Sequence, residues 1–197
     1  MLRRLGSAEE QRLVVLLKDL ATVATPAGAT RRVRLESLDH HHLPGLSELN
    51  RRRCHTRADH RFEQSLADGH RGFVGFSDGR LVGYYWWVDH EAPNAHPDLT
   101  RFGLGIELEP GDVYGSDFYV PEEHRRGGTA NAFLFALETE LADRGYRRLW
   151  GYVQDRNRAA RWLYSTRGYE PMWTVSSRVG SLGRRTPTAP ADAHVER

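Results

Sequence analysis

The sequence predicts an α/β (α+β) fold: a mixed, mostly antiparallel sheet flanked by helices, with one extra helix near the N-terminus. Two strand-like runs, 71–76 and 80–88, enclose Ser77-Asp78-Gly79, which is typical of a hairpin turn. A later unit, 113–153, has the pattern strand, helix, strand and predicts a locally parallel pair with a right-handed crossover. The 197 residues are enough for one domain plus an extension or tail.

The N-terminal segment predicts a helix over residues 7–24. Ser7 and Glu10 form a capping-box pattern. The apolar residues that follow share one helical face: Leu13, Leu16, Leu17, Leu20 and Ala24. Residues 25–30 indicate a linker, so this helix should be an appendage whose apolar stripe packs on the main domain or on a second copy of the chain. The predicted divisions are 1–30, a helical extension and linker; 31–180, the main domain; and 181–197, a disordered tail.

The remaining elements follow in order. Residues 31–36 indicate a short strand, and 38–53 and 57–68 indicate helices. A polar loop over 89–101 precedes a candidate strand at 102–108 and a strand at 113–120. Apolar residues at helical spacing predict a helix from 130 to 141, ended by Gly145. A strand at 147–153, a helix at 157–167 and an extended stretch at 169–179 complete the order.

Composition excludes several classes of protein. The 28 basic and 26 acidic residues give a net charge of only +2, which argues against a general nucleic-acid binder. No run approaches the roughly 20 apolar residues of a membrane span, and Glu9 and Glu10 argue against a signal peptide, so a cytoplasmic protein is expected. The single cysteine, Cys54, excludes an internal disulfide and a multi-cysteine zinc site, and we interpret it as incidental rather than as an activated thiolate.

The turn after the strand at 113–120 has the features of a phosphate-binding site. Gly127 and Gly128 stand at the start of the next helix, where exposed N–H groups and the helix dipole favour an anion. The turn lacks the Gly-Lys-Ser/Thr of a Walker A loop and the spacing of the dinucleotide fingerprint. Taken alone it is equally compatible with a structural turn.

A second motif changes this balance. Asn157, Ala160, Tyr164, Gly168 and Tyr169 follow one strand and one turn downstream. With Arg125, Gly128 and Ala130 of the turn, they resemble the GNAT acyltransferase superfamily, whose pyrophosphate turn is Gln/Arg-x-x-Gly-x-Gly/Ala and whose later helix is Asn-x-x-Ala-x-x-x-Tyr. The resemblance covers residues 31–180. The chain departs from the pattern at Arg126, where relatives carry glycine, and this side chain could add a phosphate contact or narrow the turn.

The resemblance implies acyl-CoA binding, with acetyl-CoA as the expected acyl donor. Backbone N–H groups of the turn would hold the pyrophosphate: Arg125, Arg126, Gly127, Gly128, Thr129 and Ala130. The end of the preceding strand would face the pantetheine arm and the thioester, with one N–H group polarising the carbonyl: Phe118, Tyr119 and Val120. Asn157 would contact the arm, and Tyr164 would protonate the departing thiolate. Arg158 and Arg161 are candidates for the cofactor's outer phosphate.

The expected acceptor is a primary amine of a small molecule that attacks the thioester directly. Asp117 is the first candidate for the general base, with orientation of the ammonium as an equal alternative. Glu109 and Asp112 are weaker candidates, and Tyr114 or Tyr119 could hold a water instead. The segment 89–117 carries seven acidic residues against Arg101 alone, and this suits a cationic amine unless the segment is simply a solvated loop. Alternation sends two of the four aromatic residues at 84–87 to each face of the sheet, so two could wall the acceptor pocket.

Alternatives to this assignment are specific. A longer acyl donor or a protein or peptide amine is one, and a degenerate module that binds coenzyme A or a partner without turnover is another, supported by Arg126. The apolar stripe of the first helix predicts a possible homodimer. His40-His41-His42 invites a metal interpretation, but consecutive helical residues diverge by roughly 100°, so three in a row do not converge on one ion, and no metal is predicted.

Overall fold

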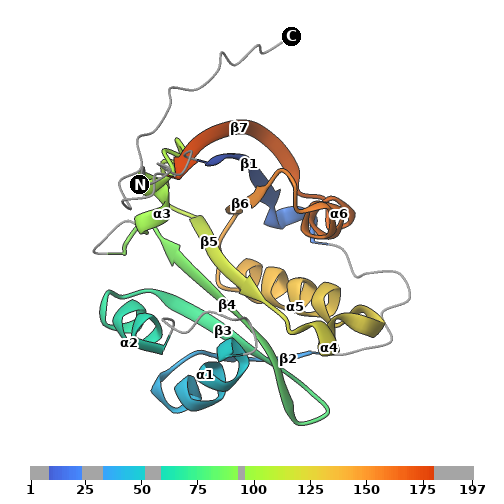
Figure 1. The fold of residues 1–197 in the computed structure, drawn as a ribbon. Helices are drawn as coiled ribbons and strands as arrows, with labels where there is room; N and C mark the ends of the chain where they lie inside the picture. The colour runs from blue at the N-terminus through green and yellow to red at the C-terminus, as the bar shows by residue number, and fades with distance from the viewer. Residues whose placement is uncertain (1–8, 24–32, 52–58, 93–95, 180–197) are drawn as a thin grey trace, which may run out of the picture.

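The computed structural model describes residues 9–23, 33–51, 59–92 and 96–179 (Figure 1). Seven strands in this part of the chain form one sheet, in the order β2-β3-β4-β5-β6-β1-β7. Their bounds are β1 (Glu9–Asp19), β2 (Arg34–Ser37), β3 (Arg71–Ser77), β4 (Arg80–Asp89), β5 (Asp112–Tyr119), β6 (Arg148–Gln154) and β7 (Glu170–Val179). Neighbours pair antiparallel except β5 and β6, which are parallel. The predicted mixed, mostly antiparallel sheet is therefore confirmed.

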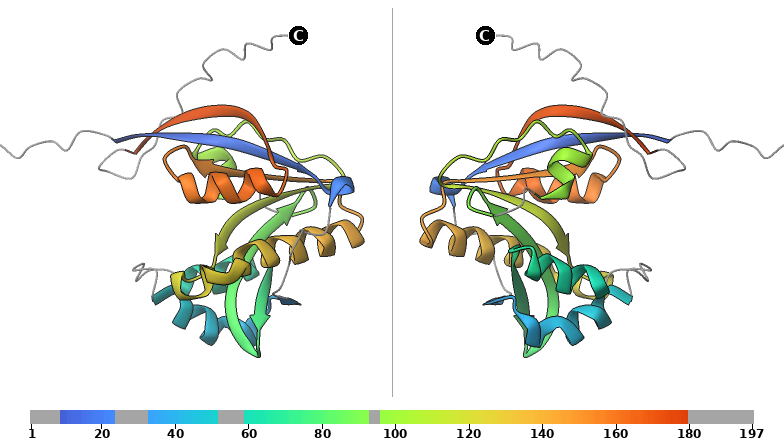
Figure 2. Two further views of the ribbon diagram at one scale, coloured as in Figure 1. Left: turned by 90° about the vertical axis from the view of Figure 1, so that its right-hand side faces the viewer. Right: turned by 90° about the vertical axis from the view of Figure 1, so that its left-hand side faces the viewer.

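Helices cover both faces of the sheet (Figures 1 and 2). The α-helices are α1 (Leu43–Arg51), α2 (Asp59–Ala67), α3 (Pro97–Arg101), α4 (Glu122–Arg125), α5 (Thr129–Asp143) and α6 (Arg158–Thr166). Three-residue 3-10 helices are η1 (Leu20–Thr22), η2 (His40–His42) and η3 (Arg126–Gly128). Helices α5 and α6 lie on one face, and α1, α2 and α3 lie on the other. The sheet is therefore buried on both sides.

The aromatic side chains of strand β4 pack on both faces of the sheet. Tyr85 and Trp87 pack in the cluster that contains the apolar face of α5, whereas Tyr84 and Trp86 pack against Leu46 of α1 and its neighbours. The predicted division of these four aromatic residues, two to each face, is confirmed. The hairpin of β3 and β4 and the strand–helix–strand unit of β5, α5 and β6 also form as predicted.

The predicted N-terminal helix is wrong, because residues 9–19 form strand β1. β1 lies inside the sheet, paired with both β6 and β7. Leu13 and Val15 pack into one core cluster, and Val14 and Leu16 pack into the cluster on the opposite face. A strand that is buried on both faces has a continuous apolar run, which also satisfies helical spacing. Because the chain's own core covers these side chains, they no longer support a homodimer.

The segment 102–108, predicted as a candidate strand, is not a strand. Phe102, Leu104 and Ile106 alternate into the core as a strand would require. However, Gly103 and Gly105 adopt positive φ, and the carbonyl of Leu104 accepts a hydrogen bond from the Trp173 indole at 2.8 Å instead of joining a ladder. The predicted loop before it contains the short helix α3. The predicted tail, 181–197, lies outside the described residues. No helix within them is long and apolar enough to cross a membrane.

Candidate active site

Strands β5 and β6 separate near the middle of the sheet. Their parallel pairing joins residues 112–114 to residues 148–150 and goes no further. Between β4 and β5 the register shifts, so that Trp86 lies opposite Asp117 while Trp87 lies opposite Gly115. Ser116 is the additional residue of a β-bulge, a feature that bends a strand and increases its twist. The bulge and the end of the pairing together open a wedge between the two strands.

A cavity of about 270 Å³ fills this wedge on the α5–α6 side, and we call it the wedge cavity. Gly115 is needed here, because a Cβ at this position would overlap the Tyr85 hydroxyl. The lining residues from β5 and β6 are joined by others from β1, β4 and α6: Leu16, Tyr85, Asn157, Ala160, Tyr164 and Tyr169. The wedge cavity thus lies between the sheet and helix α6.

A second cavity of about 260 Å³ lies on the opposite face, and we call it the helix-side cavity. It lies against α1, α2 and α3, and its polar lining is Asn50, Arg61, Ser65, His70, His96, Asp98 and Arg101. Its aromatic lining is Phe62, Tyr84, Trp86 and Phe102. Ser116, Asp117 and Tyr152 line both cavities. The bulge of β5 is therefore the place where the two faces of the sheet meet.

The predicted phosphate turn forms a sharp entry to α5. Gly127 and Gly128 have φ of 73° and 79°, the left-handed region that favours glycine, and no side chain caps the N-terminus of α5 at Gly128. The guanidinium of Arg125 donates from Nε to the carbonyl of Val120 at 2.8 Å and so braces the end of β5. Thr129 is buried and Ala130 packs partly on the core. The side chain of Arg126 lies outside what the structure describes.

The residues predicted to face the pantetheine arm diverge. Phe118 lines the wedge cavity and packs between Tyr85 and Phe133, with ring centroids 5.8 and 5.4 Å away. The Tyr119 side chain points to the opposite face, where its ring lies 5.7 Å from that of Tyr84. Val120 is buried in the α5 cluster. Only Phe118 of the three offers its side chain to the wedge cavity.

Helix α6 supplies the second predicted set. Asn157 lines the wedge cavity and caps α6, since its Oδ1 accepts the N–H of Ala160 at 3.1 Å. Arg161 pairs instead with Asp155 at 2.8 Å. Arg158 and Arg161 line a separate groove between α6 and strands β1 and β7. Asn157 is thus fixed by the helix start, and Arg161 lies outside the wedge cavity.

Tyr164 projects from α6 into the wedge cavity. The side chain is half-buried, and its ring meets that of Tyr169 edge-on with centroids 4.8 Å apart. Burial raises the pKa of the Tyr164 hydroxyl well above its usual range, and the negative charges of Asp117 and Glu138 act in the same direction. The hydroxyl therefore stays protonated at neutral pH and can act as a proton donor.

Asp117 stands at the junction of the two cavities. Its Oδ2 accepts a hydrogen bond from the Tyr84 hydroxyl at 3.3 Å. Most of the other acidic residues predicted to line an acceptor pocket do not reach it. Asp112 and Glu109 hold Arg148, and Asp89 holds Arg71 and the Tyr146 hydroxyl. Asp98 does reach it, so the acidic lining consists of two carboxylates rather than seven.

Histidines of the helix-side cavity were not anticipated from the sequence. Burial lowers the pKa of His96 to about 4, helped by the neighbouring His70 and Arg61, and burial also lowers the pKa of His70. Asp98 faces the same space, where burial raises its pKa and the Tyr152 hydroxyl donates to it at 3.4 Å. Both histidines are therefore neutral at pH 7. No local motif marks these residues, because the topology alone brings α2, α3 and β6 together.

Comparisons with known proteins agree with this architecture. Residues 16–169 match the family described as the acetyltransferase (GNAT) family. No curated protein matches the sequence. Two of the matching solved structures are longer than this chain. A functionally unknown conserved protein from Staphylococcus epidermidis matches with a TM-score of 0.59 and 12% identity, over 86% of this chain and 61% of that chain. A putative GNAT acetyltransferase from Novosphingobium aromaticivorans matches with a TM-score of 0.53 and 14% identity, over 86% of this chain and 64% of that chain.

Other matches have a similar length. The ribosomal-protein-S18-alanine N-acetyltransferase from Escherichia coli has a TM-score of 0.54 and 17% identity, over 84% of this chain and 99% of that chain. The aminoglycoside N-acetyltransferase AAC(6')-Iy, solved with CoA, has a TM-score of 0.53 and 17% identity, over 76% of this chain and 93% of that chain. These identities establish the fold alone. The family match over most of the chain establishes that the protein belongs to the acetyltransferase (GNAT) family.

Proposed function

We propose that the protein transfers an acetyl group from acetyl-CoA to a primary amine of a small molecule, by direct attack of the amine on the thioester. One observation carries this proposal: two cavities on opposite faces of the sheet meet at Ser116, Asp117 and Tyr152. The donor arm would enter from the α5–α6 side and the amine from the helix-side cavity. Such an arrangement brings two substrates into contact without a covalent enzyme intermediate.

The donor side supplies anion binding and a proton. Uncapped N–H groups at the start of α5 would hold the pyrophosphate, and an N–H of the 118–120 segment would polarise the thioester carbonyl. Asn157 would contact the arm. Tyr164 would donate its proton to the thiolate of coenzyme A as the carbon–sulfur bond breaks.

The acceptor side supplies charge and aromatic walls. An alkylammonium would be attracted by Asp117 and Asp98 and would pack against the aromatic walls of the helix-side cavity. The amine must lose a proton before it attacks, and Asp117 lies where that proton would be released. A cavity of about 260 Å³ suits a small molecule better than a folded protein surface.

The test combines binding with turnover. Calorimetric titration with acetyl-CoA should give 1:1 binding, and a free-thiol assay with a panel of small primary amines should show release of coenzyme A with one chemical class. Turnover only with amino-terminal peptides would replace the small-molecule acceptor by a peptide. Binding without thiol release for any amine would indicate a non-catalytic module, and no binding would indicate that Arg126 closes the turn.

A further inference from the structure

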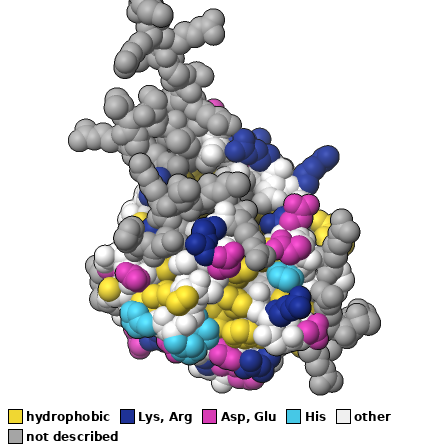
Figure 3. Space-filling view, turned by 60° about the horizontal axis from the view of Figure 1, so that its bottom comes forward, with side chains coloured by type: hydrophobic (Ala, Val, Ile, Leu, Met, Phe, Trp, Pro, Cys, Tyr) yellow, Lys and Arg dark blue, Asp and Glu magenta, His cyan; other side chains and the backbone are white. Residues whose placement is uncertain are grey.

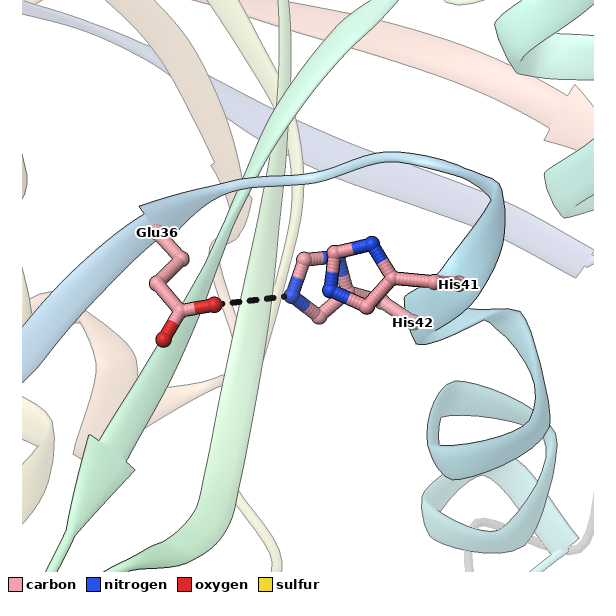
Figure 4. A group of neighbouring side chains, drawn as sticks. All are labelled: Glu36, His41 and His42. Carbon is pink, nitrogen blue, oxygen red and sulfur yellow. Dashed lines mark hydrogen bonds and ion pairs between the residues drawn. The ribbon is translucent and has the colours of Figure 1, made fainter.

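A cluster of metal-binding side chains lies away from both cavities, where β2 leads into α1 (Figure 4). Glu36 comes from β2, and His41 and His42 come from η2. One donor atom of each residue lies within 4.8 Å of the donor atoms of the other two. The Nε2 atom of His42 is 3.2 Å from Oε2 of Glu36. Figure 3 shows histidine side chains beside acidic ones on the face at the bottom of Figure 1.

The local backbone explains why consecutive histidines converge. Asp39 caps η2, and the imidazole rings of His41 and His42 lie side by side, with centroids 3.7 Å apart and planes tilted by 36°. Both rings extend toward Glu36 (Figure 4). The sequence argument against a metal required three successive histidines to share one ion. The structure instead takes two of them and adds a carboxylate from the neighbouring strand, while His40 is not part of the group.

We propose that Glu36, His41 and His42 form a binding site for Zn²⁺. Two imidazoles and one carboxylate are a donor set that zinc prefers, whereas calcium and magnesium prefer oxygen donors alone. Two donors that each lie about 2.1 Å from a tetrahedral ion are roughly 3.4 Å apart. The observed 3.2 Å between His42 Nε2 and Glu36 Oε2 is close to that separation. A water would complete the fourth position.

The surroundings of the three side chains fit the same role. Arg34 pairs with Oε1 of Glu36 and leaves Oε2 facing His42. Asp39 Oδ1 contacts Nδ1 of His41 and lies 3.3 Å from Nδ1 of His42. A carboxylate on the outer nitrogen of a ligating histidine orients the ring and strengthens it as a ligand.

Zinc would change one hydrogen bond at this site. The backbone N–H of Asp39 donates to Nδ1 of His42 at 3.2 Å, and Oδ1 of Asp39 lies 3.3 Å from the same nitrogen. Ligation of zinc through Nε2 would place the ring proton on Nδ1, so the bond from the Asp39 N–H would be lost and the Asp39 carboxylate would accept the ring proton instead. The site would then tie the edge strand β2 to η2 and α1. Because α1 contributes Asn50 to the helix-side cavity, zinc would stabilise the wall of that cavity.

The experiment uses the full chain after removal of metal with a chelator. Calorimetric titration with ZnCl₂ should show one ion per chain, and Zn²⁺ should raise the thermal midpoint of unfolding. His41→Ala and Glu36→Gln should each weaken this binding at least about 10-fold, in line with loss of a ligand. His40→Ala is the matched control, since this exposed neighbour lies outside the group and its variant should bind as the unsubstituted chain does.

Each outcome decides the proposal. Absence of binding, or binding that His41→Ala and Glu36→Gln leave unchanged, overturns it. Cobalt substitution adds a spectroscopic readout that is independent of stability. The expected Co²⁺ spectrum has visible bands from nitrogen and oxygen donors, and a thiolate-to-cobalt band in the near ultraviolet would instead assign the ion to Cys54 and overturn the site proposed here.

Discussion

Replacement of Tyr164 by phenylalanine should remove catalysis while leaving the fold and the binding of acetyl-CoA intact. The ring packs edge-on against Tyr169 at 4.8 Å, and phenylalanine keeps that contact. Only the hydroxyl in the wedge cavity is lost, so the free energy of unfolding should change by about 1 kcal/mol or less. A positioned general acid contributes roughly 10²–10⁴-fold to the rate. The activation barrier should therefore rise by about 3–5 kcal/mol.

The assay is thiol release under saturating acetyl-CoA and amine, with donor affinity measured separately by calorimetry. Tyr146→Phe is the matched control, because its hydroxyl bonds Asp89 at 2.7 Å and lines neither cavity. Its kcat should stay close to that of the unsubstituted chain. Since burial raises the pKa of Tyr164, its deprotonation should cause no loss of rate between pH 7 and about 10. A Tyr164→Phe variant that retains kcat within about threefold would refute the role assigned to the hydroxyl.

Further predictions concern packing and charge. Gly115→Ala should destabilise the fold by about 1–3 kcal/mol in urea unfolding, because the new methyl overlaps a buried hydroxyl, whereas Gly151→Ala in the same cavity makes only ordinary contacts and should not. Arg167→Met should cost about 3–5 kcal/mol, because it strands the buried carboxylate of Glu138, and adding Glu138→Gln should restore part of the loss. The folded pKa of His96, about 4, lies below the usual 6.5, so the unfolded chain binds more protons in that window and stability falls as pH drops through it. Between pH 7 and pH 4, the free energy of unfolding of the His96→Gln variant should fall by roughly 3 kcal/mol less than that of the unsubstituted chain. Equal decreases would show that His96 is not the source of this pH dependence.

The local parts of the fold could be predicted from the sequence. The glycine turn at 77–79, the helix after Gly128 and the strand on either side of it are set by neighbours in the chain, and all three form as predicted. Asn157 and Tyr164, which line the wedge cavity, could be predicted from a local pattern too, because they belong to a helix whose start and end are both marked in the sequence. Motifs that lie within one helix or turn could thus be recognised from the sequence alone.

The pairing of segments that are distant in the sequence could not be predicted from the sequence. The run from Leu13 to Leu17 fits a helix by spacing, yet the β-branched Val14 and Val15 favour a strand, and only the partners β6 and β7 decide between them. The helix-side cavity has the same origin, because His96 and Tyr152 are 56 positions apart and meet through the crossing of α3 over the sheet. Residues brought together only by topology leave no periodic or motif signal.

The β-bulge in β5 determines which residues of this strand line the two cavities. A regular ladder between β4 and β5 would turn successive side chains to alternate faces. Because position 115 faces Tyr85 on the α5 side, such a ladder would direct Asp117 to that side and Phe118 to the opposite face. The extra residue, Ser116, breaks that alternation at the point where the pairing with β6 has ended. Asp117 then lines the cavities on both faces, and the side chain of Phe118 is turned to the α5 side. In the proposed reaction the amine and the thioester would meet beside this one inserted residue, where the linings of the two cavities coincide.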